Sequence, residues 1–525
     1  MTAEIVSNLT RRRLLELAAR AAGVAVAAPL IDPLAALSSA PRWPAGRLPA
    51  SAAGRIDPSQ FLPQSQLHVW QQQLDRMGLR ATASPVHEQY IDHLRDRLER
   101  AGVRQLRFEP VPLDRWTTDT WSLRILGGSS PGVVETASYI PYSGRTPAGG
   151  VTGRLTLVDP SRPPAPGSLT GRIAVFDVPL VSFTYETFLL ISYKAYDPGK
   201  VFVPDHVYAR PWLGVGDEIT FLDGLAGSGA KATVGVLDLP AEAAHGAYYP
   251  YDGKIRAVPG VYVDRDTGTR LKDAAASGAA ARLTLPATVR RVTSRNLIGV
   301  IPGASDELML LHSHTDGPNG VEDNGPNAII AISQYLARLP RSALPRTIMV
   351  LLTTGHFHGA IGTAEFVRRH RNGLLRRIAG AVTLEHLGAR AWEPGPNGRY
   401  TISGYEPGTI FTPESSALVD ASYAALRSAN AAPCALLRPY VAAPGSPDGN
   451  GWPAEGTDLW TMGAIPTANY ITGPSYLLNW GIPTMDKLDL ARMRREAISF
   501  TQMLLNLSRV PSAHLRKLDL LTHST

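Results

Sequence analysis

The chain has 525 residues, of which 44% are hydrophobic and 18% charged, and this balance excludes a disordered or collagen-like protein. The 52 basic and 45 acidic residues give a net charge of +7, and because no dense block of lysine and arginine follows the first 13 residues, nucleic-acid binding is not favoured. The single cysteine, Cys434, excludes an intrachain disulfide framework and a cysteine-rich metal cluster.

The first 40 residues have the order of an export signal. Residues 10–15 (Thr-Arg-Arg-Arg-Leu-Leu) place a polar residue and arginines before an apolar pair, and an Ala/Val/Leu-rich segment then runs to the small residues at 38–40. This order resembles a twin-arginine signal peptide. We therefore expect export to the cell envelope or the medium, with no membrane association once the signal is removed. A Pro/Ala-rich linker over 41–65 is expected to follow.

The next part of the chain divides into a helical and a β-rich stretch. Over 66–102 apolar residues recur at helical spacing, and Gly78 and the Ser84-Pro85 step separate two helices. From about residue 133 to 285, short β-rich runs such as 171–176 and 232–237 are broken by glycine and proline. We expect 66–132 to open the main domain and 133–290 to form a separate β-rich lobe.

From residue 296 onward, predicted strands and helices alternate. Strands are predicted over 308–311, 347–352, 378–384 and 465–471, and helices over 327–339, 362–369 and 486–507. Continuous apolar strands separated by helices are typical of a doubly wound, mostly parallel sheet with helices on both faces. The predicted fold class is therefore α/β, with a catalytic-like domain over 291–510 and a tail over 511–525.

Histidines and carboxylates follow three of these strands. The first strand runs into residues 312–316 (His-Ser-His-Thr-Asp), the second precedes 355–359 (Gly-His-Phe-His-Gly), and the third ends at Glu385-His386. In open α/β sheets the carboxyl ends of the strands face one crevice, and imidazole and carboxylate groups are ligands that suit zinc. Each motif alone also fits a turn or a solvated loop, but their coincidence predicts one shared site.

Several segments resemble the zinc-dependent aminopeptidases of metallopeptidase family 28, over about residues 66–508. Residues 80–88 resemble the family's N-terminal segment, and 296–303 resemble the strand that opens its catalytic domain. Residues 314–316 match its His-x-Asp element, 323–325 its bridging aspartate and turn, and 359–366 its Gly-x-x-Gly-Ser helix entry. The lobe over 133–290 resembles a protease-associated domain. The resemblance implies a zinc-exopeptidase-like fold with that domain inserted before the catalytic core.

The resemblance also implies roles for individual residues. His314 would ligate a metal, Asp323 would bridge two metals, and Asp316 would orient His314. Glu385 stands where the family usually has a metal-binding aspartate. In the family, zinc polarises the substrate carbonyl and lowers the pKa of a bound water toward about 7.

The sequence departs from the family at the expected ligands. In our alignment the family's paired glutamates, a general base and then a ligand, correspond to His356 and Phe357, and phenylalanine cannot bind a metal. The family's last ligand, a histidine before the C-terminal helix, has no counterpart near residues 479–483. The implied ligand set is therefore incomplete. One zinc ion is compatible with it, two are not expected, and a site without metal stays open.

The two histidines at 356 and 358 offer a replacement for the missing groups. If the backbone stays extended from Gly355 to Gly359, both side chains point to the same side, so that one could ligate and the other serve as the base. The sequence does not decide which histidine ligates. The site assigned here has His356 and Asp316 as catalytic residues and four metal ligands: His314, Asp323, His358 and Glu385.

Three further residues are expected to bind substrate: Asp458, Trp460 and Trp480. Aromatic walls at a crevice suit sugar or aromatic ligands, although packing in the core explains them as well. The sequence thus predicts a secreted metallo-aminopeptidase-like hydrolase of peptide or related amide bonds, with an altered, single-metal site. Two alternatives stay open: a catalytically inactive binding protein on the same fold, and an enzyme of changed reaction class, cyclase- or glycan-directed. The oligomeric state is not predicted.

Overall fold

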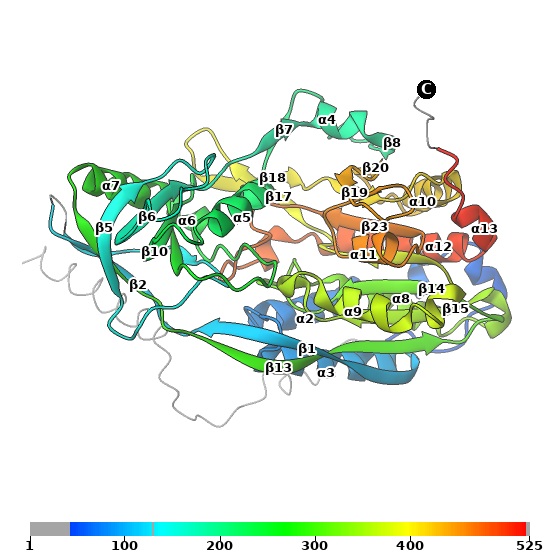
Figure 1. Ribbon diagram of the computed structural model, residues 1–525. Coiled ribbons are helices and arrows are strands. Elements are labelled where there is room, and N and C mark those ends of the chain that lie inside the picture. Colours follow the sequence, from blue (N-terminus) through cyan, green and yellow to red (C-terminus); the bar gives the residue numbers. More distant parts are fainter. Residues whose placement is uncertain (1–42, 129–130, 521–525) are drawn as a thin grey trace, which may run out of the picture.

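A computed structural model describes residues 43–128 and 131–520 (Figure 1). The expected signal peptide lies outside the described residues. Within them, two large sheets of nine and eight strands account for most of the β-structure. No helix in this part of the chain is long and apolar enough to cross a membrane.

The nine-stranded sheet has a parallel centre, in agreement with the predicted α/β fold class. Strands β14, β15, β16 and β23 run parallel, while β13 on one side and β19 on the other pair with them antiparallel. β1 is antiparallel to β13 at the edge of the sheet. Beyond β19, β20 is parallel to it and β8 is antiparallel to β20. In spatial order the strands are β1 (Arg104–Thr118), β13 (Ala287–Ile301), β15 (Arg346–Thr353), β14 (Ser305–His314), β16 (Ile378–Leu384), β23 (Thr467–Thr472), β19 (Gly408–Phe411), β20 (Cys434–Leu437) and β8 (Ser192–Tyr196).

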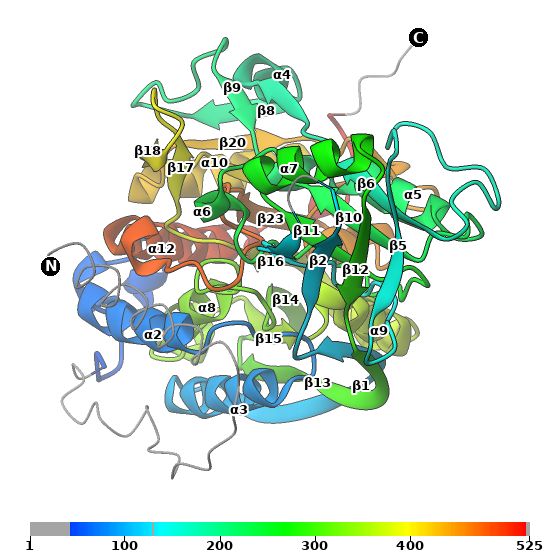
Figure 2. The same cartoon turned by 90° about the vertical axis from the view of Figure 1, so that its left-hand side faces the viewer.

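Helices cover both faces of this sheet. Successive residues of its central strands are apolar and point to opposite faces, so that each face needs a cover. In β14, Met309 and Leu311 pack into one core cluster, and Leu308 and Leu310 into another. Figure 2 shows α2, α8 and α12 on one side of the central strands and α9 on the other. The helices on the first side are α2 (Gln64–Arg76), α3 (Pro85–Arg100), α8 (Gly325–Leu336), α10 (Ser416–Ala429) and α12 (Leu490–Leu507), and those on the second are α9 (Ile361–His370) and α11 (Thr457–Thr461).

The second sheet is the core of the predicted β-rich lobe. Its strands β5, β6, β10 and β11 are parallel. Two helices that the sequence analysis did not predict belong to this lobe: α5 (Val215–Gly224), between β6 and β10 in the chain, and α7 (Arg265–Ala276), between β11 and β12. The spatial order is β3 (Gly132–Val134), β2 (Ser122–Leu126), β12 (Ala280–Thr284), β5 (Val151–Leu157), β6 (Arg172–Asp177), β10 (Ala232–Val236), β11 (Gly260–Val263) and β4 (Ser138–Tyr139).

The two sheets are connected in more than one place. The long ribbon of β1 and β13 leads from one sheet to the other, and Trp116 and Ala287 at its far end pack into the core of the second sheet (Figure 1). Between β6 and β10 the chain also leaves the second sheet: after β7 (Ser182–Thr184) and α4 (Tyr185–Leu190), β8 forms the edge of the nine-stranded sheet, and β9 (Val207–Ala209) leads back.

Candidate active site

The predicted strand ends lie next to one another in the structure. The His314 Nε2 atom at the end of β14 is 3.7 Å from Glu322 Oε1 and 3.8 Å from Glu385 Oε2, which follows β16. The Nε2 atoms of His356 and His386 lie 3.6 Å and 3.5 Å from the same Glu322 oxygen. Imidazoles and carboxylates that are far apart along the chain therefore share one buried site.

Main-chain carbonyls determine which nitrogen of two histidines faces this site. His314 Nδ1 lies 3.0 Å from the carbonyl oxygen of Asp316, and His386 Nδ1 lies 2.7 Å from that of Thr472. Because a carbonyl oxygen only accepts hydrogen bonds, each Nδ1 carries the proton and donates it. Both Nε2 atoms therefore present a lone pair to the site, which is the form in which histidine binds a metal.

Five buried polar atoms at the centre of the site have no hydrogen-bond partner: His314 Nε2, His386 Nε2, both carboxylate oxygens of Glu322, and Glu385 Oε2. A buried acceptor without a hydrogen bond lowers the stability of the folded protein by about 1 to several kcal/mol. One ligand atom each from His314, Glu322 and His386 lies within 4.8 Å of the others, and the same holds for His314, His356 and Glu385. A divalent cation satisfies such acceptors, so these residues fit a single zinc or a similar ion.

Burial raises the pKa values of the acids in this site and opposes protonation of its histidines. It raises the pKa of Glu322 well above its ordinary value, with a further rise from the charges of Asp323, Asp316 and Glu385. Burial also raises the pKa of Glu385 to about 7 and lowers the pKa of His386 to about 3. Clustered carboxylates in a dry site repel one another, and a bound cation would stabilise their ionised forms.

His356 forms a strong pair with Glu455, a residue that the sequence analysis did not single out. The His356 Nδ1 atom is 2.6 Å from Glu455 Oε2, and the other carboxylate oxygen accepts hydrogen bonds from the hydroxyls of Thr353 and Thr363. Burial disfavours charge on His356, but the hydrogen bond and charge of Glu455 outweigh it and raise the pKa of His356 to about 9. The ring of His356 also stacks on that of His314, with centroids 4.2 Å apart.

Asp316 holds the turn that carries His356. Its carboxylate accepts hydrogen bonds from the main-chain N–H groups of His356 (3.1 Å) and Phe357 (3.0 Å) and from the hydroxyl of Thr82 (2.6 Å). It contacts His314 through its main-chain carbonyl and not through its carboxylate. The carboxylate of Asp316 therefore positions the His356 turn.

The backbone between Gly355 and Gly359 is not extended, so the condition under which both histidines would point to the same side is not met. Residues His356–His358 form a 3-10 turn, flanked by Gly355 (φ +79°) and Gly359 (φ +69°) in the left-handed region that favours glycine. The turn removes the alternation that would have placed both histidines on one side. The ring of His358 packs edge-on against Tyr142, with centroids 5.4 Å apart, and lies outside both groups of potential ligands.

Asp323 pairs with an arginine, whereas the preceding Glu322 faces the histidines. Both Asp323 oxygens accept hydrogen bonds of 2.6 Å from Arg80, and neither side chain is exposed. The loop is held close to the strand ends, since a Cβ atom at Gly325 would lie 2.2 Å from the carbonyl oxygen of Leu384. The structure thus brings His314, His356 and Glu385 together, and places Asp323 and His358 outside the central cluster.

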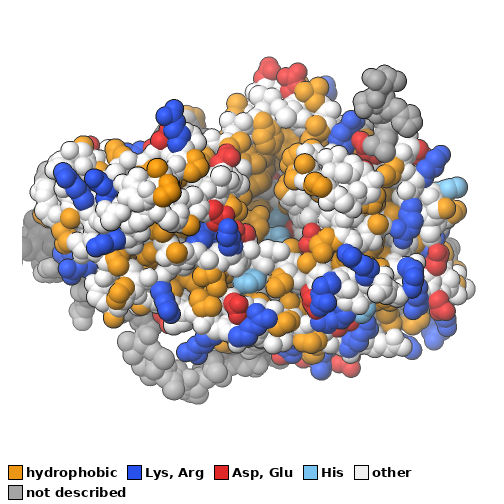
Figure 3. All heavy atoms as spheres, in the orientation of Figure 1, with side chains coloured by type: hydrophobic (Ala, Val, Ile, Leu, Met, Phe, Trp, Pro, Cys, Tyr) orange, Lys and Arg blue, Asp and Glu red, His pale blue; other side chains and the backbone are white. Residues whose placement is uncertain are grey.

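A pocket of about 310 Å³ opens onto the cluster. Trp212, Tyr251 and Trp452 contribute aromatic walls, and Figure 3 shows a hollow on this face with histidine at its bottom and hydrophobic side chains beside it. The three residues expected to bind substrate do not line it. Trp460 donates to Asp448 (3.0 Å), Trp480 packs against Trp121, and Asp458 is largely buried, which raises its pKa to about 6.

Comparisons with family models and with curated proteins find no match. Solved structures do match. A peptidase M28 precursor from Shewanella amazonensis has a TM-score of 0.59 at 17% identity, covering 85% of this chain and 98% of its own. A zinc aminopeptidase from Bacillus subtilis has a TM-score of 0.58 at 14% identity, covering 84% and 94%. An aminopeptidase from Aneurinibacillus has 0.52 at 16%, covering 87% and 94%. The chain therefore has the α/β fold of the M28 aminopeptidases.

Proposed function

We propose that the protein is a hydrolase of peptide or related amide bonds, which binds one divalent metal ion through His314, Glu322 and His386, with Glu385 beside them. The observation that carries this proposal is the convergence of five buried, unpartnered ligand atoms, two of them histidine lone pairs fixed by main-chain carbonyls. When bound, the ion would polarise the scissile carbonyl and activate a water for attack.

The pair of His356 and Glu455 supplies the acid–base chemistry. His356 lines the pocket beside the proposed ligands, and the Nε2 atom of its charged ring holds the proton that is passed to the leaving amine. A proton from the attacking water then restores the charged ring. Glu455 keeps the proton on Nδ1 and stabilises the charged ring, and the hydroxyls of Thr353 and Thr363 hold that carboxylate in place.

The pocket favours an amino-terminal residue with an apolar side chain. Its walls are mostly aromatic and aliphatic. Among the described residues that line it there is no lysine or arginine, but there are four acids: Asp252, Glu322, Glu385 and Glu455. A substrate ammonium group fits such surroundings, whereas a substrate carboxylate would find no positive partner except histidine. An aminopeptidase is therefore favoured over a carboxypeptidase.

We also propose that the chain is exported through its twin-arginine-like segment, and that the lobe built on the second sheet is a protease-associated domain. N-terminal sequencing of protein recovered from the medium tests the export, since a start near residue 41 is expected and a start at Met1 contradicts it.

The catalytic proposal is tested by measuring metal content and activity on the same variants. The wild-type protein should carry about one metal ion per chain and hydrolyse aminoacyl anilides. His386→Ala should lose both properties. His356→Ala should keep the metal but lose activity by about 10²- to 10⁴-fold, because it removes only the proton carrier.

The exposed His68 provides the control, since His68→Ala should leave metal and activity unchanged. Wild-type protein that is purified through its export route without metal, and that cleaves no aminoacyl anilide, would contradict the proposal and favour an inactive binding protein.

A further inference from the structure

A second, larger pocket lies apart from the proposed active site. It has a volume of about 970 Å³ and shares no lining residue with the pocket over the histidines. It is formed where α3 turns into β1 and where α8 ends. Gly102 (φ +91°) allows these two elements to meet, because a Cβ atom there would lie 2.8 Å from that of Ala337.

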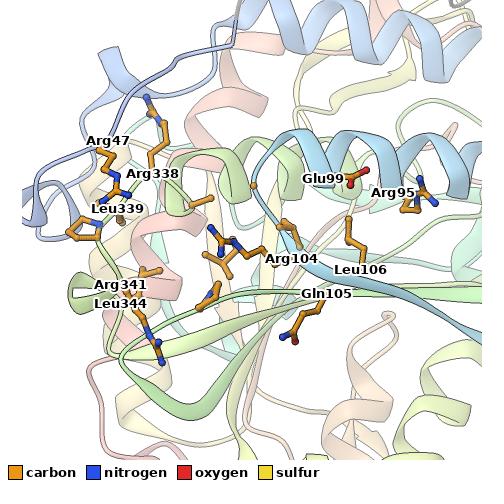
Figure 4. Close-up of a pocket in the computed structure, with 16 residues that line it drawn as sticks. Arg47, Arg95, Glu99, Arg104, Gln105, Leu106, Arg338, Leu339, Arg341 and Leu344 are labelled. Carbon is orange, nitrogen blue, oxygen red and sulfur yellow. The ribbon is translucent and has the colours of Figure 1, made fainter.

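Arginine dominates the walls of this pocket. Five arginines and one glutamate line it, and in Figure 4 Arg47, Arg338 and Arg341 gather at one end while Glu99 and Arg95 lie at the other. Arg95 has a carboxylate partner, Asp96, at 3.2 Å. Among the described residues, the other four have no such partner: Arg47, Arg104, Arg338 and Arg341.

The excess positive charge remains after the local negative charges are counted. Glu99 offsets one arginine, and the C-terminal ends of α3 and α8 each contribute about half a negative charge. About two of the four unpaired positive charges are then left without compensation. The pocket therefore carries a charge that matches a dianion.

The guanidinium group of Arg338 is only partly satisfied by hydrogen bonds. Its Nη2 group donates to the carbonyl of Gln60 and its guanidinium lies over the Tyr335 ring, but its Nε and Nη1 groups are buried without a partner. Burial lowers the pKa of Arg338. The N–H of Leu48 donates to the Arg338 carbonyl at 2.9 Å, which fixes Arg47 beside it.

We propose that this pocket binds a phosphoryl group carrying two negative charges. The four guanidinium groups without a carboxylate partner and the pocket's size beyond a lone phosphate favour a phosphoryl group that belongs to a larger molecule or surface. Two sources present this chemistry, a free phosphate compound and the phosphomonoester headgroup of phosphatidic acid.

Arg47 and Arg104 allow a test that spares the fold, because both are exposed and neither side chain makes a hydrogen bond within the described residues. Binding of inorganic phosphate is measured by calorimetry at low salt, and binding to vesicles of phosphatidylcholine with or without phosphatidic acid is measured by sedimentation. Arg47→Gln/Arg104→Gln should weaken binding at least about tenfold. The matched double variant Arg124→Gln/Arg290→Gln removes the same charge elsewhere and should change it less than about twofold.

The two ligand arms identify the source. Phosphate binding that is lost in the Arg47/Arg104 variant supports a soluble phosphoryl ligand, and binding only to vesicles that contain phosphatidic acid, lost in the same variant, supports a lipid headgroup. Absence of binding in both arms, or equal weakening in the control variant, overturns the proposal. Activity on aminoacyl anilides should be the same in all three proteins, because no catalytic residue is changed.

Discussion

Two adjacent carboxylates, Glu322 and Asp323, have different partners although both are completely buried. Asp323 is neutralised by Arg80, which makes two hydrogen bonds to it, whereas Glu322 has unpartnered oxygens next to three histidines. A positive charge from the chain itself thus occupies the side of the loop where the family resemblance implies a bridging aspartate. Arg80 leaves Glu322 as the acidic ligand that is free to bind a cation.

Exchanging each acid for its amide separates these roles. Glu322→Gln should lose most of the bound metal while the free energy of unfolding of the metal-free protein stays equal or rises, since an unpaired buried acid is removed. Asp323→Asn should keep the metal but lower the free energy of unfolding by about 3–5 kcal/mol, because Arg80 is left as a buried charge without its partner.

Elemental analysis and urea unfolding of the two variants provide the measurements. Asp92→Asn, an exposed acid on α3, serves as the control and should change neither quantity measurably. If Asp323→Asn removed the metal as completely as Glu322→Gln does, Asp323 would be a ligand after all and this assignment would fail.

The sequence located the site better than it identified its members. Histidines and acids after three strands could be found from pattern alone, because strand ends meet at one edge of a sheet. The choice between Glu322 and Asp323 depends on Arg80, 243 residues away in the chain, and the role of Glu455 depends on its contact with His356, 99 residues away. No local spacing records such contacts. His386 was visible beside Glu385, but its role depends on the carbonyl of Thr472.

At the scale of elements, long apolar patterns were predictable and context-dependent ones were not. The strand predicted over 378–384 is β16, and the helices predicted over 327–339 and 362–369 correspond to α8 and α9 with shifts of a few residues. In the second lobe, α7 has only four buried residues in twelve, and two of them are Thr267 and Gly268, so that only Leu271 and Ala274 mark its buried face as apolar in the sequence. β8 lies in the second lobe's part of the chain but pairs with β20, a long-range contact.

Helix α5 of the second lobe carries a buried acid that is independent of the proposed metal site. The carboxyl of Glu218 and the main-chain carbonyl of Tyr249 both lie within hydrogen-bond distance of the Tyr262 hydroxyl. Because one hydroxyl proton cannot serve both acceptors, a protonated Glu218 that donates to Tyr262 satisfies all three groups. Burial raises the pKa of Glu218 to about 8, against a smaller opposing effect of Tyr262 and Arg256.

This raised pKa predicts a pH-dependent stability. In the unfolded chain Glu218 ionises near its ordinary pKa of 4.5, whereas the folded protein keeps the proton up to about pH 8. Its contribution is therefore complete below pH 4.5 and is lost as the pH rises to 8, at about 1.4 kcal/mol per unit. Glu218→Gln should gain a few kcal/mol relative to wild type between pH 5 and pH 8, measured by urea unfolding. Asp217→Asn, an exposed neighbour, should show no such change, and parallel pH profiles of wild type and Glu218→Gln would rule the effect out.

At the scale of the whole molecule, a buried ion pair fastens the second lobe to the catalytic-like sheet. Arg210 follows β9 and precedes α5, and its Nη2 and Nη1 groups lie 2.7 Å and 3.0 Å from carboxylates of Glu406 and Glu393. The Tyr208 hydroxyl donates to Glu406 at 2.9 Å as well. Trp212, two residues after Arg210, lines the proposed substrate pocket. The ion pair therefore holds the second lobe against the nine-stranded sheet and also fixes the segment that places Trp212 in the pocket wall.

Breaking this pair should affect stability and substrate binding together. Arg210→Met leaves Glu406 buried without a cation and should lower the free energy of unfolding by about 3–5 kcal/mol. The double variant Arg210→Met/Glu406→Leu should recover much of that loss, because the buried charge is removed with its partner.

In Arg210→Met the metal content should stay unchanged while the KM for substrates with an apolar amino-terminal residue rises, since only the Trp212 wall is released. Arg162→Met, which breaks an exposed pair with Asp159 at 3.9 Å, should cost less than about 0.5 kcal/mol. A rise in KM in the absence of any stability loss, or a stability loss that the double variant does not relieve, would show that the two lobes are held together by other contacts.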